Sequence, residues 1–366
     1  MPQAREAGLG KASLISLRGS PRERGLIHGE ALREQITIRL ARCKADLAGQ
    51  RATDPAGVGH HLARLLARTS FVEAMARWTP ELLAEIEGIA DGAAISKDDA
   101  LVLNLMDELA WFSVHENNAE SCSAVGIRPQ GVPALVGQTM DLTESFDGSQ
   151  AILQIEDTEA RSLVLTSAGM VGLCGVNSDA VAIFCNQLLS LRPSVTGLPA
   201  AAVVRGALAR RSFSQARAFI DSIEHASGQN YLLAGPEETV NLECSAAGVC
   251  ECPSTERSVW HTNHPLASVD LAGGDDERPG FSGGSHERLS FLQERVPQAS
   301  SLEDLQAIFA DRSVPICKLP GPDGRELTFA AFVAQLSTPP RVWIAAGPPD
   351  RSPFSEFAFS QAGRPA

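Results

Sequence analysis

The order in which helical and strand-like patterns follow one another most constrains the fold of this chain. The first third carries apolar residues at helical spacing, with helix-start signals at Ser20-Pro21 and Thr79-Pro80. Between Ser123 and Gln187 the pattern changes to short β-like runs about ten residues apart, and helices and then further strands follow. Because helices and strands do not alternate one by one, the sequence predicts an α+β fold with antiparallel strands rather than a parallel α/β fold.

The expected elements can be placed along the chain by residue number. Helices are expected at 21–44, 80–92, 96–111, 200–209, 212–223, 286–294 and 302–310. Strands are expected at 124–127, 134–139, 151–155, 162–166, 172–176, 180–184, 231–234, 239–243, 258–262, 329–336 and 341–346. The sequence shows no internal repeat, so a solenoid or propeller is not expected.

The acidic composition excludes some classes of partner. The 366 residues include 44 acidic and 31 basic side chains, a net charge of −13, whereas binding to nucleic acid or to an anionic membrane needs clustered cations. No apolar run reaches the roughly 18 residues that cross a bilayer, and the stretch from Met1 to Lys11 lacks the apolar core of a secretory signal. We therefore expect a cytoplasmic protein that binds neither nucleic acid nor membrane.

The eight cysteines do not form a metal or redox motif. None lie in a C-x-x-C pair, and Cys250 and Cys252 lack a second pair of ligands at zinc spacing. Several occupy apolar, strand-like runs, where a free thiol behaves as a small hydrophobic side chain. The pattern indicates reduced, structural cysteines, and we expect neither a metal nor a cofactor.

Cys122 is the one cysteine with a chemical interpretation of its own. It stands at the start of the first expected strand, directly after the polar, turn-prone stretch 117–121. If the Ser121–Cys122 peptide bond were cut, the α-amine of Cys122, with a pKa of about 8, would lie beside the thiol and could serve as its general base. On spacing alone, an ordinary half-buried thiol is the more common use of such a cysteine.

Other polar residues fit a site only in combination. Asp141 ends the second expected strand, where it either begins a turn or receives a donor such as a cationic α-amine. Asn263 could donate an amide hydrogen to an oxyanion, whereas His261 and His264 lack an acidic third ligand at a fixed spacing and do not indicate a metal site. The chain has no G-x-S-x-G, Walker or G-x-G-x-x-G motif, which excludes α/β-hydrolase, P-loop and Rossmann enzymes.

Several short motifs follow one another in a definite order. They are Arg24-Gly25-Leu26-Ile27-His28-Gly29, Glu85-Ile86-Glu87-Gly88-Ile89-Ala90-Asp91-Gly92, Cys122-Ser123-Ala124, Gly137-Gln138-Thr139-Met140-Asp141, Gly175-Val176-Asn177-Ser178, Asn186, His261-Thr262-Asn263-His264 and Gly347-Pro348-Pro349. With these motifs the chain resembles, along nearly its whole length, the peptidase C45 family of acyl-coenzyme A:6-aminopenicillanic acid acyltransferase-like proteins. These are N-terminal-nucleophile hydrolases, to which the choloylglycine hydrolases are more distantly similar.

The resemblance implies both a fold and a processing event. The fold would be a four-layer αββα sandwich. Self-cleavage between Ser121 and Cys122 would divide the single domain into a helical segment, 1–121, and a catalytic segment, 122–366.

The resemblance also implies roles for individual residues. Cys122 matches the family's nucleophile, and Asp141 matches the aspartate that orients it. Asn263 matches a side-chain donor of the oxyanion hole, and a backbone N–H near Asn186 matches the second donor. The substrate-binding positions correspond to Arg325 and to the serine of an L-E-x-S segment, Ser245.

The implied activity is hydrolysis or transfer of the acyl group of a small N-acyl compound, through an acyl-enzyme thioester and without a cofactor. An acyl-CoA-dependent N-acyltransferase is the alternative enzyme, and an unprocessed, non-catalytic binder of acyl ligands is the alternative outside catalysis. Ser121 and Ala124 replace a glycine and a threonine of the penicillin acyltransferases, which keeps the non-catalytic alternative open. Gln138 replaces an arginine of the choloylglycine relatives, which argues against recognition of bile salts. Assembly into a homo-oligomer is left open.

Overall fold

The computed structural model describes residues 12–51, 55–112, 121–156, 161–272, 284–320 and 326–359. The helices are α1 (Pro21–Ala31), α2 (Arg33–Arg51), α3 (Pro55–Arg68), α4 (Phe71–Trp78), α5 (Pro80–Ala93), α6 (Lys97–Leu103), α7 (Met106–Phe112), α8 (Ala200–Leu208), α9 (Phe213–Ser222), α10 (Ser285–Arg295) and α11 (Leu302–Ala310), with 3-10 turns η1 (Glu144–Phe146) and η2 (Val296–Gln298). The strands are β1 (Ser13–Leu17), β2 (Ser121–Ile127), β3 (Leu135–Leu142), β4 (Gln150–Glu156), β5 (Arg161–Ser167), β6 (Cys174–Asn177), β7 (Ala182–Gln187), β8 (Gln229–Ala234), β9 (Thr239–Ser245), β10 (Gly248–Glu251), β11 (Ser258–His261), β12 (Leu327–Gln335), β13 (Arg341–Ala345) and β14 (Ser355–Ala358). Across the described ranges, no helix combines the length and the apolar character that crossing a membrane requires.

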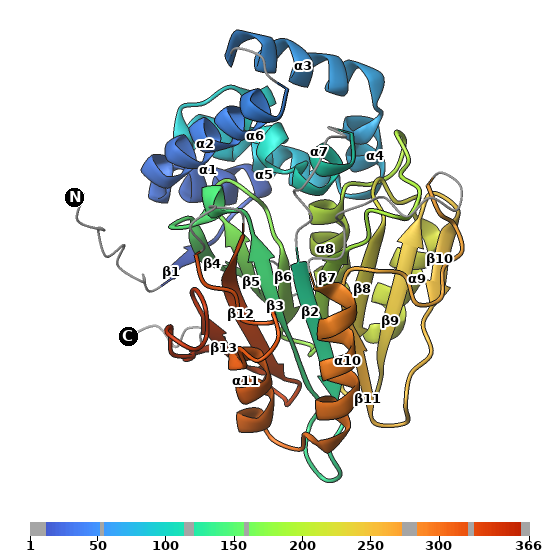
Figure 1. The fold of residues 1–366 in the computed structure, drawn as a ribbon. Coiled ribbons are helices and arrows are strands. Elements are labelled where there is room, and N and C mark those ends of the chain that lie inside the picture. The colour runs from blue at the N-terminus through green and yellow to red at the C-terminus, as the bar shows by residue number, and fades with distance from the viewer. Residues whose placement is uncertain are drawn as a thin grey trace, which may run out of the picture.

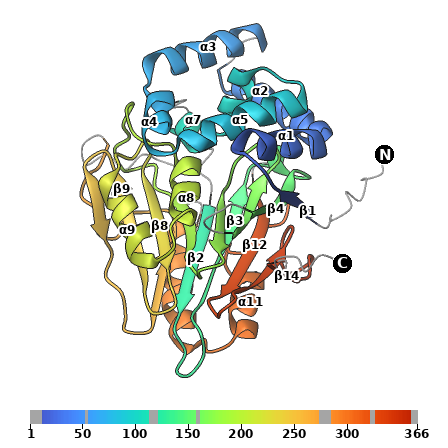
Figure 2. The same ribbon diagram turned by 180° about the vertical axis from the view of Figure 1, so that it is seen from behind.

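The strands form two sheets that pack face to face. One has the order β1-β4-β5-β6-β7-β8-β9-β10, and the other has the order β11-β2-β3-β12-β13-β14. In Figure 1 α10 and α11 lie in front of the six-stranded sheet, and in Figure 2, seen from behind, α8 and α9 lie in front of the eight-stranded sheet. This arrangement is a four-layer αββα sandwich, so the expected α+β fold class is confirmed.

Three apolar cores fill the interfaces between these four layers. Strand β2 contributes to two of them, because successive side chains of a strand point to opposite faces. Cys122 and Ala124 lie in the core between the two sheets, whereas Val125 and Ile127 lie in the core beneath α10 and α11. The alternation therefore decides which residues of β2 can face a site between the sheets.

Helices α1 and α5 approach each other closely because each carries two glycines four residues apart. A Cβ atom at Gly25 of α1 would lie 1.9 Å from a backbone carbonyl oxygen of α5, and one at Gly88 of α5 would lie 2.2 Å from a backbone carbonyl oxygen of α1. Gly29 and Gly92 repeat the contact one turn later. Two of the motifs noted in the sequence therefore encode a helix–helix contact.

The same two helices carry a buried charge network. Glu85 accepts two hydrogen bonds from Arg205 of α8, at 2.7 and 3.0 Å, and Arg24 lies 3.5 Å from the same carboxylate. His28 is buried, and its Nε2 accepts a hydrogen bond from Gly169 N at 3.1 Å. Burial lowers the pKa of His28 to about 4, so the ring is neutral near pH 7. The network joins α1 and α5 to α8.

Two of the expected helices are divided in the structure. The expected helix 21–44 breaks at Leu32, between α1 and α2, and the expected helix 96–111 breaks at Asn104, between α6 and α7. The side chain of Asn104 donates to Gly169 O and accepts from Val171 N, which fixes the second break against the loop after β5. Polar side chains that bond to distant backbone are not visible in a helical periodicity.

Several elements have no counterpart among those expected from the sequence. They are α3, α4, β1, β10 and β14. The three strands are four or five residues long, and among the described residues each is the outermost strand of its sheet. A short edge strand buries few side chains, so its apolar alternation is weak.

Candidate active site

Cys122 is the second residue of β2. This strand belongs to the six-stranded sheet and is labelled in Figure 1. β2 pairs with β3, where Cys122 is opposite Met140, and with β11 on its other side. The cysteine is 4% exposed and belongs to the core between the sheets. Ser121, one residue earlier on the strand, is opposite Asp141 and points to the other face.

The side chain of Asn263, which follows β11, holds the backbone of Cys122. Its Oδ1 accepts a hydrogen bond from Cys122 N at 2.7 Å and another from Arg288 Nη2 at 2.9 Å, while its Nδ2 donates to Gln187 O at 3.0 Å. Two donors on one atom identify that atom as the oxygen of the amide. The structure therefore brings Cys122 and Asn263 together, with the amide oxygen facing the cysteine backbone.

Arg288 of α10 joins this group, although sequence reasoning did not single it out. Its Nη1 donates to Cys122 O at 2.6 Å and to Ser123 Oγ at 2.9 Å. The side chain is completely buried, and burial lowers its pKa, but a guanidinium stays charged in proteins. A signal was present, since Arg288 lies on the buried stripe of α10 that contains Leu289 and Leu292.

Asp141 of β3 is buried beside Ser121. Its Oδ1 accepts from Thr328 Oγ1 at 2.6 Å, and its Oδ2 lies 3.9 Å from Lys318 Nζ. Burial raises the pKa of this carboxyl to about 7, against the opposing effects of Lys318 and Thr328. Because Asp141 is on the face of the sheet opposite to the thiol, it is placed to act on the backbone around Ser121 rather than on the Cys122 sulfur.

Asn186 of β7 belongs to a row of amides between the two sheets. Its Oδ1 accepts from Asn230 Nδ2 at 2.9 Å, and its Nδ2 donates to His261 O at 3.5 Å. Asn230 also donates to Asn241 Oδ1 at 3.2 Å. The Asn186 side chain therefore cross-links the sheets, and a donor to an oxyanion at this position would be a backbone N–H, as the family resemblance implies.

Gln138 of β3 has a structural partner in the eight-stranded sheet. Its Nε2 donates to Cys185 O, and its Oε1 accepts from Cys185 N at 3.2 Å. The pairing of β6 with β7 extends along β7 only as far as Ile183. At Cys185, the Gln138 amide makes the backbone hydrogen bonds that a neighbouring strand would otherwise make. Both ends of the Gln138 amide thus bind the backbone of Cys185 rather than an anionic ligand.

The two substrate-binding positions implied by the resemblance remain predictions. Arg325 lies outside the described residues. Ser245 ends β9, where its hydroxyl donates to Asp270 Oδ2 at 2.6 Å and accepts from Ala247 N at 3.2 Å. These bonds fix the loop after β11, and within the described part of the chain they do not link Ser245 to Cys122.

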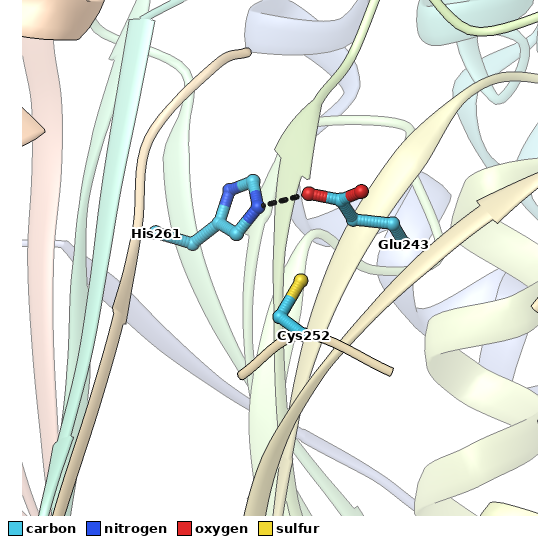
Figure 3. A group of neighbouring side chains, drawn as sticks. All are labelled: Glu243, Cys252 and His261. Carbon is cyan, nitrogen blue, oxygen red and sulfur yellow. Dashed lines mark hydrogen bonds and ion pairs between the residues drawn. The ribbon is translucent and has the colours of Figure 1, made fainter. Parts of the chain in front are cut away.

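A second buried cluster supports the turn that carries Asn263. Glu243, Cys252 and His261 converge between β9 and β11 (Figure 3). His261 Nε2 lies 2.8 Å from Glu243 Oε1, and its Nδ1 lies 2.8 Å from Thr262 O. The ring is therefore held between the Glu243 carboxylate and the Thr262 carbonyl oxygen.

The partners of Glu243 decide what this cluster does. The carboxylate also accepts hydrogen bonds from the backbone N–H groups of Leu266, Ala267 and Ser268. Burial raises the pKa of Glu243, but the bonds from His261 and from this loop outweigh burial and lower it to about 2. Both oxygens are therefore occupied, and the cluster anchors the loop after Asn263 rather than presenting a free carboxylate to a cation.

Comparisons with known proteins agree with the motifs. The family model of acyl-coenzyme A:6-aminopenicillanic acid acyl-transferase matches residues 129–350, which begin just after β2 and include Asp141, Asn186, Asn263 and Arg288. The 40 kDa form of the acyl-coenzyme A:6-aminopenicillanic-acid-acyltransferase of Emericella nidulans is 30% identical over 258 residues, which are 69% of this chain and 69% of that protein.

Solved structures that align with this chain include two with related names. A variant of the conjugated bile acid hydrolase from Clostridium perfringens aligns with a TM-score of 0.45 and 10% identity, over 66% of this chain and 94% of the other. The penicillin V acylase from Agrobacterium tumefaciens aligns with a TM-score of 0.42 and 11% identity, over 62% and 83%. On the family match and the curated relative, this chain belongs to the acyl-coenzyme A:6-aminopenicillanic acid acyl-transferase family, whose members are enzymes of the amide hydrolase and acyltransferase class.

Proposed function

We propose that the chain is a self-processing cysteine amide hydrolase or acyltransferase with Cys122 as its N-terminal nucleophile. One observation carries the proposal: Cys122 N is bonded to Asn263 Oδ1 at 2.7 Å, while Arg288 holds both Cys122 O and Asn263. A nucleophile needs a general base within hydrogen-bond reach. An α-amine freed at Cys122 would be such a base, already oriented by Asn263.

Self-cleavage would create that amine. The Cys122 thiol loses its proton and attacks the carbonyl carbon of Ser121, so a C–S bond forms and the C–N bond to Cys122 breaks. The Cys122 nitrogen gains a proton and becomes a free amine, and water then opens the thioester to leave a carboxylate on Ser121. The products are the segments 1–121 and 122–366.

Turnover would use the same thiol on an external amide. The Cys122 amine takes the thiol proton while Asn263 Oδ1 accepts one of its hydrogens, which leaves the nitrogen lone pair directed away from Asn263. The thiolate attacks the substrate carbonyl to form an acyl-enzyme thioester, and water or an amine then resolves it. Arg288 acts as a positioning residue, because it fixes both Cys122 O and Asn263.

Two donors would stabilise the oxyanion of this reaction. Asn263 Nδ2 carries two hydrogens, and among the described residues one of them is used by Gln187 O. The second hydrogen, together with a backbone N–H near Asn186, would bind the oxyanion. One such donor typically lowers the barrier by about 3–4 kcal/mol.

The substrate class follows from the relative rather than from a bound ligand. The Emericella protein is named for acyl-coenzyme A and 6-aminopenicillanic acid, which favours a small N-acyl compound for this chain as well. The same name supports the second candidate, an acyl-CoA-dependent N-acyltransferase in which an amine rather than water resolves the thioester.

Intact mass of the purified protein tests the central step. The wild-type chain should separate under denaturing conditions into segments 1–121 and 122–366, whereas Cys122→Ala should stay uncut. Cys122→Ser should cut more slowly, because a hydroxyl makes the same shift less readily. An active wild-type protein that remains a single chain would rule out the mechanism.

A panel of N-acyl amides, with and without acyl-CoA and amine acceptors, then separates hydrolysis from transfer.

A further inference from the structure

We infer that Lys318 and Glu326 are positioning residues for self-cleavage, because together they hold the side chain of Ser121, the residue whose carbonyl carbon Cys122 attacks. The inference rests on the proposed function and adds to it the groups that act on the acyl side of the scissile bond. It concerns residues that neither the motifs nor the family match singled out.

The Ser121 hydroxyl is held from two sides. Lys318 Nζ donates to Ser121 Oγ at 2.8 Å, and Ser121 Oγ donates to Glu326 Oε2 at 3.2 Å. Lys318 and Glu326 also form an ion pair with each other. Ser121 is 1% exposed, and each of the two charged side chains is 16% exposed. The hydroxyl therefore accepts one hydrogen bond from Lys318 and donates one to Glu326. All three side chains are largely buried, and hydrogen bonds are electrostatically stronger in the protein interior than at the surface.

Lys318 is itself fixed by a closed ring of contacts. Its backbone N–H donates to Thr328 Oγ1 at 2.8 Å, and its carbonyl oxygen accepts from Thr328 N at 3.0 Å. Thr328 donates to Asp141, and Asp141 is the partner of both Ser121 and Thr328 in the register of adjacent strands. Ser121, Asp141 and Thr328 thus form one row across the sheet, with Lys318 bridging over it.

This arrangement has two consequences for the cleavage step. Holding the side chain of Ser121 keeps this residue in place at the start of β2, and so helps to keep its carbonyl carbon within reach of the Cys122 sulfur. The ammonium of Lys318 also lies beside the residue on which negative charge develops, first on the tetrahedral oxygen and later on the product carboxylate. Both effects favour the reaction without any change in the thiol.

The test follows cleavage in the full-length chain carrying Lys318→Met. The time course is taken by intact mass, in the wild-type sequence and in the slower Cys122→Ser background, where uncut chain can be purified first. Cleavage should slow by about tenfold to a hundredfold, the range expected for loss of a hydrogen bond to a charged group. Lys318→Arg should restore part of the rate. Lys97→Met, which removes an exposed ion pair to Glu87, is the matched control and should cut at the normal rate.

A double-variant cycle separates positioning from general destabilisation. In chains that carry Ser121→Ala, Glu326→Gln should have little further effect, because the hydroxyl that Glu326 holds is gone. Lys318→Met should slow cleavage less in this background than in the wild-type sequence, because only the effect of its charge remains to be lost. Equal slowing by Lys318→Met with and without Ser121 would overturn the inference, as would normal cleavage in Lys318→Met. A wild-type chain that never cuts would instead refute the proposed function, so the two failures are distinct.

Discussion

Asn263 presents its two ends to two different groups, and the ends can be tested separately. Its Oδ1 accepts hydrogen bonds from Cys122 N and Arg288. Its Nδ2 donates one hydrogen to Gln187 O and would donate the other to the oxyanion. Asn263→Ala should lower kcat by roughly 10²–10³-fold with a modest change in KM, because the oxyanion forms only in the transition state. Asn263→Asp keeps the two acceptor contacts but loses the donor, and should be at least as slow. Initial rates of hydrolysis of an amide substrate give kcat and KM for both variants.

The control for Asn263 is a distant amide. Gln298→Ala removes an exposed side chain that donates only to Glu294 O among the described residues, and should leave the rates unchanged. Near-normal turnover in processed Asn263→Ala would show that another group stabilises the oxyanion. Normal turnover in Asn263→Asp alone would show that only the carbonyl end matters.

Asp141 should set the pH at which the Cys122 amine becomes a base. Burial raises the pKa of Asp141 to about 7, so the carboxyl is ionised on the alkaline side of neutrality. A nearby carboxylate favours the ammonium form of an amine and raises its pKa. Asp141→Asn removes that effect and should lower the pKa of the amine. The limb of the pH profile, that is, the part over which kcat/KM rises with pH, should therefore move to lower pH.

The pH profile of kcat/KM, taken beside that of Asp147→Asn, checks this sign. Asp147 is a partly buried residue of the turn after η1, and its substitution should leave the limb in place. An unchanged limb in Asp141→Asn would mean that the Asp141 carboxylate does not affect the pKa of the Cys122 amine. A limb that moves to higher pH would contradict the electrostatic argument itself.

These residues differ in how far the sequence alone reveals them. Cys122, Asp141 and Asn263 stand at strand ends inside short motifs, so pattern and order suffice to single them out. Arg288 does not stand in such a motif, and a charged residue on a helix is usually solvated. Which end of Asn263 faces Cys122 depends on Arg288, and a contact between α10 and β2 cannot be inferred from local spacing.

At the scale of elements, the contact between α1 and α5 depends on the absence of side chains. A methyl group at Gly88 would fall 2.2 Å from a carbonyl oxygen of α1, so the two helices would have to separate. We expect Gly88→Ala to lower the free energy of unfolding by about 3 kcal/mol or more, at the upper end of overpacking effects. Urea denaturation of the uncut Cys122→Ala chain measures this as a single transition.

The reverse exchange on the same helix provides the control. Ala94 caps α5 in the left-handed conformation, with φ of 58°. A glycine adopts this conformation without the steric cost that alanine bears, so Ala94→Gly should stabilise the chain by about 0.5–1 kcal/mol. Stabilisation by Gly88→Ala together with destabilisation by Ala94→Gly would show that glycine content, rather than the contact between the helices, controls stability.

The elements that the sequence predicts well are those that bury a complete face. The strands β2, β3, β4 and β5 agree with their apolar runs, whereas the edge strands β1, β10 and β14 were not expected. The pairing of β1 with β4 joins Ser13–Leu17 to a strand more than a hundred residues later. Such a pairing depends on where the sheet leaves an edge, which is a property of the assembled fold.

At the scale of the whole molecule, the two proposed segments share one core. β1, from segment 1–121, is a strand of the eight-stranded sheet whose other strands come from segment 122–366. The core between this sheet and the helices contains Ile36 and Leu82 of the first segment together with Val164 and Val203 of the second. Cutting one peptide bond leaves this interface in place, so the segments should stay together in native buffer.

Cleavage should nevertheless change how stability depends on concentration. Unfolding of an uncut chain is unimolecular, but unfolding of a cut complex releases two chains, so dilution favours the unfolded side. The Tm of the processed wild-type protein should therefore fall as the protein is diluted over two decades, whereas the Tm of Cys122→Ala should not move. Size-exclusion chromatography should give one peak for both proteins in native buffer, and two for the processed protein only in denaturant. A processed protein whose segments separate in native buffer would mean that the core described here is not retained after cleavage. A Tm independent of concentration in both proteins would mean that the segments remain covalently linked.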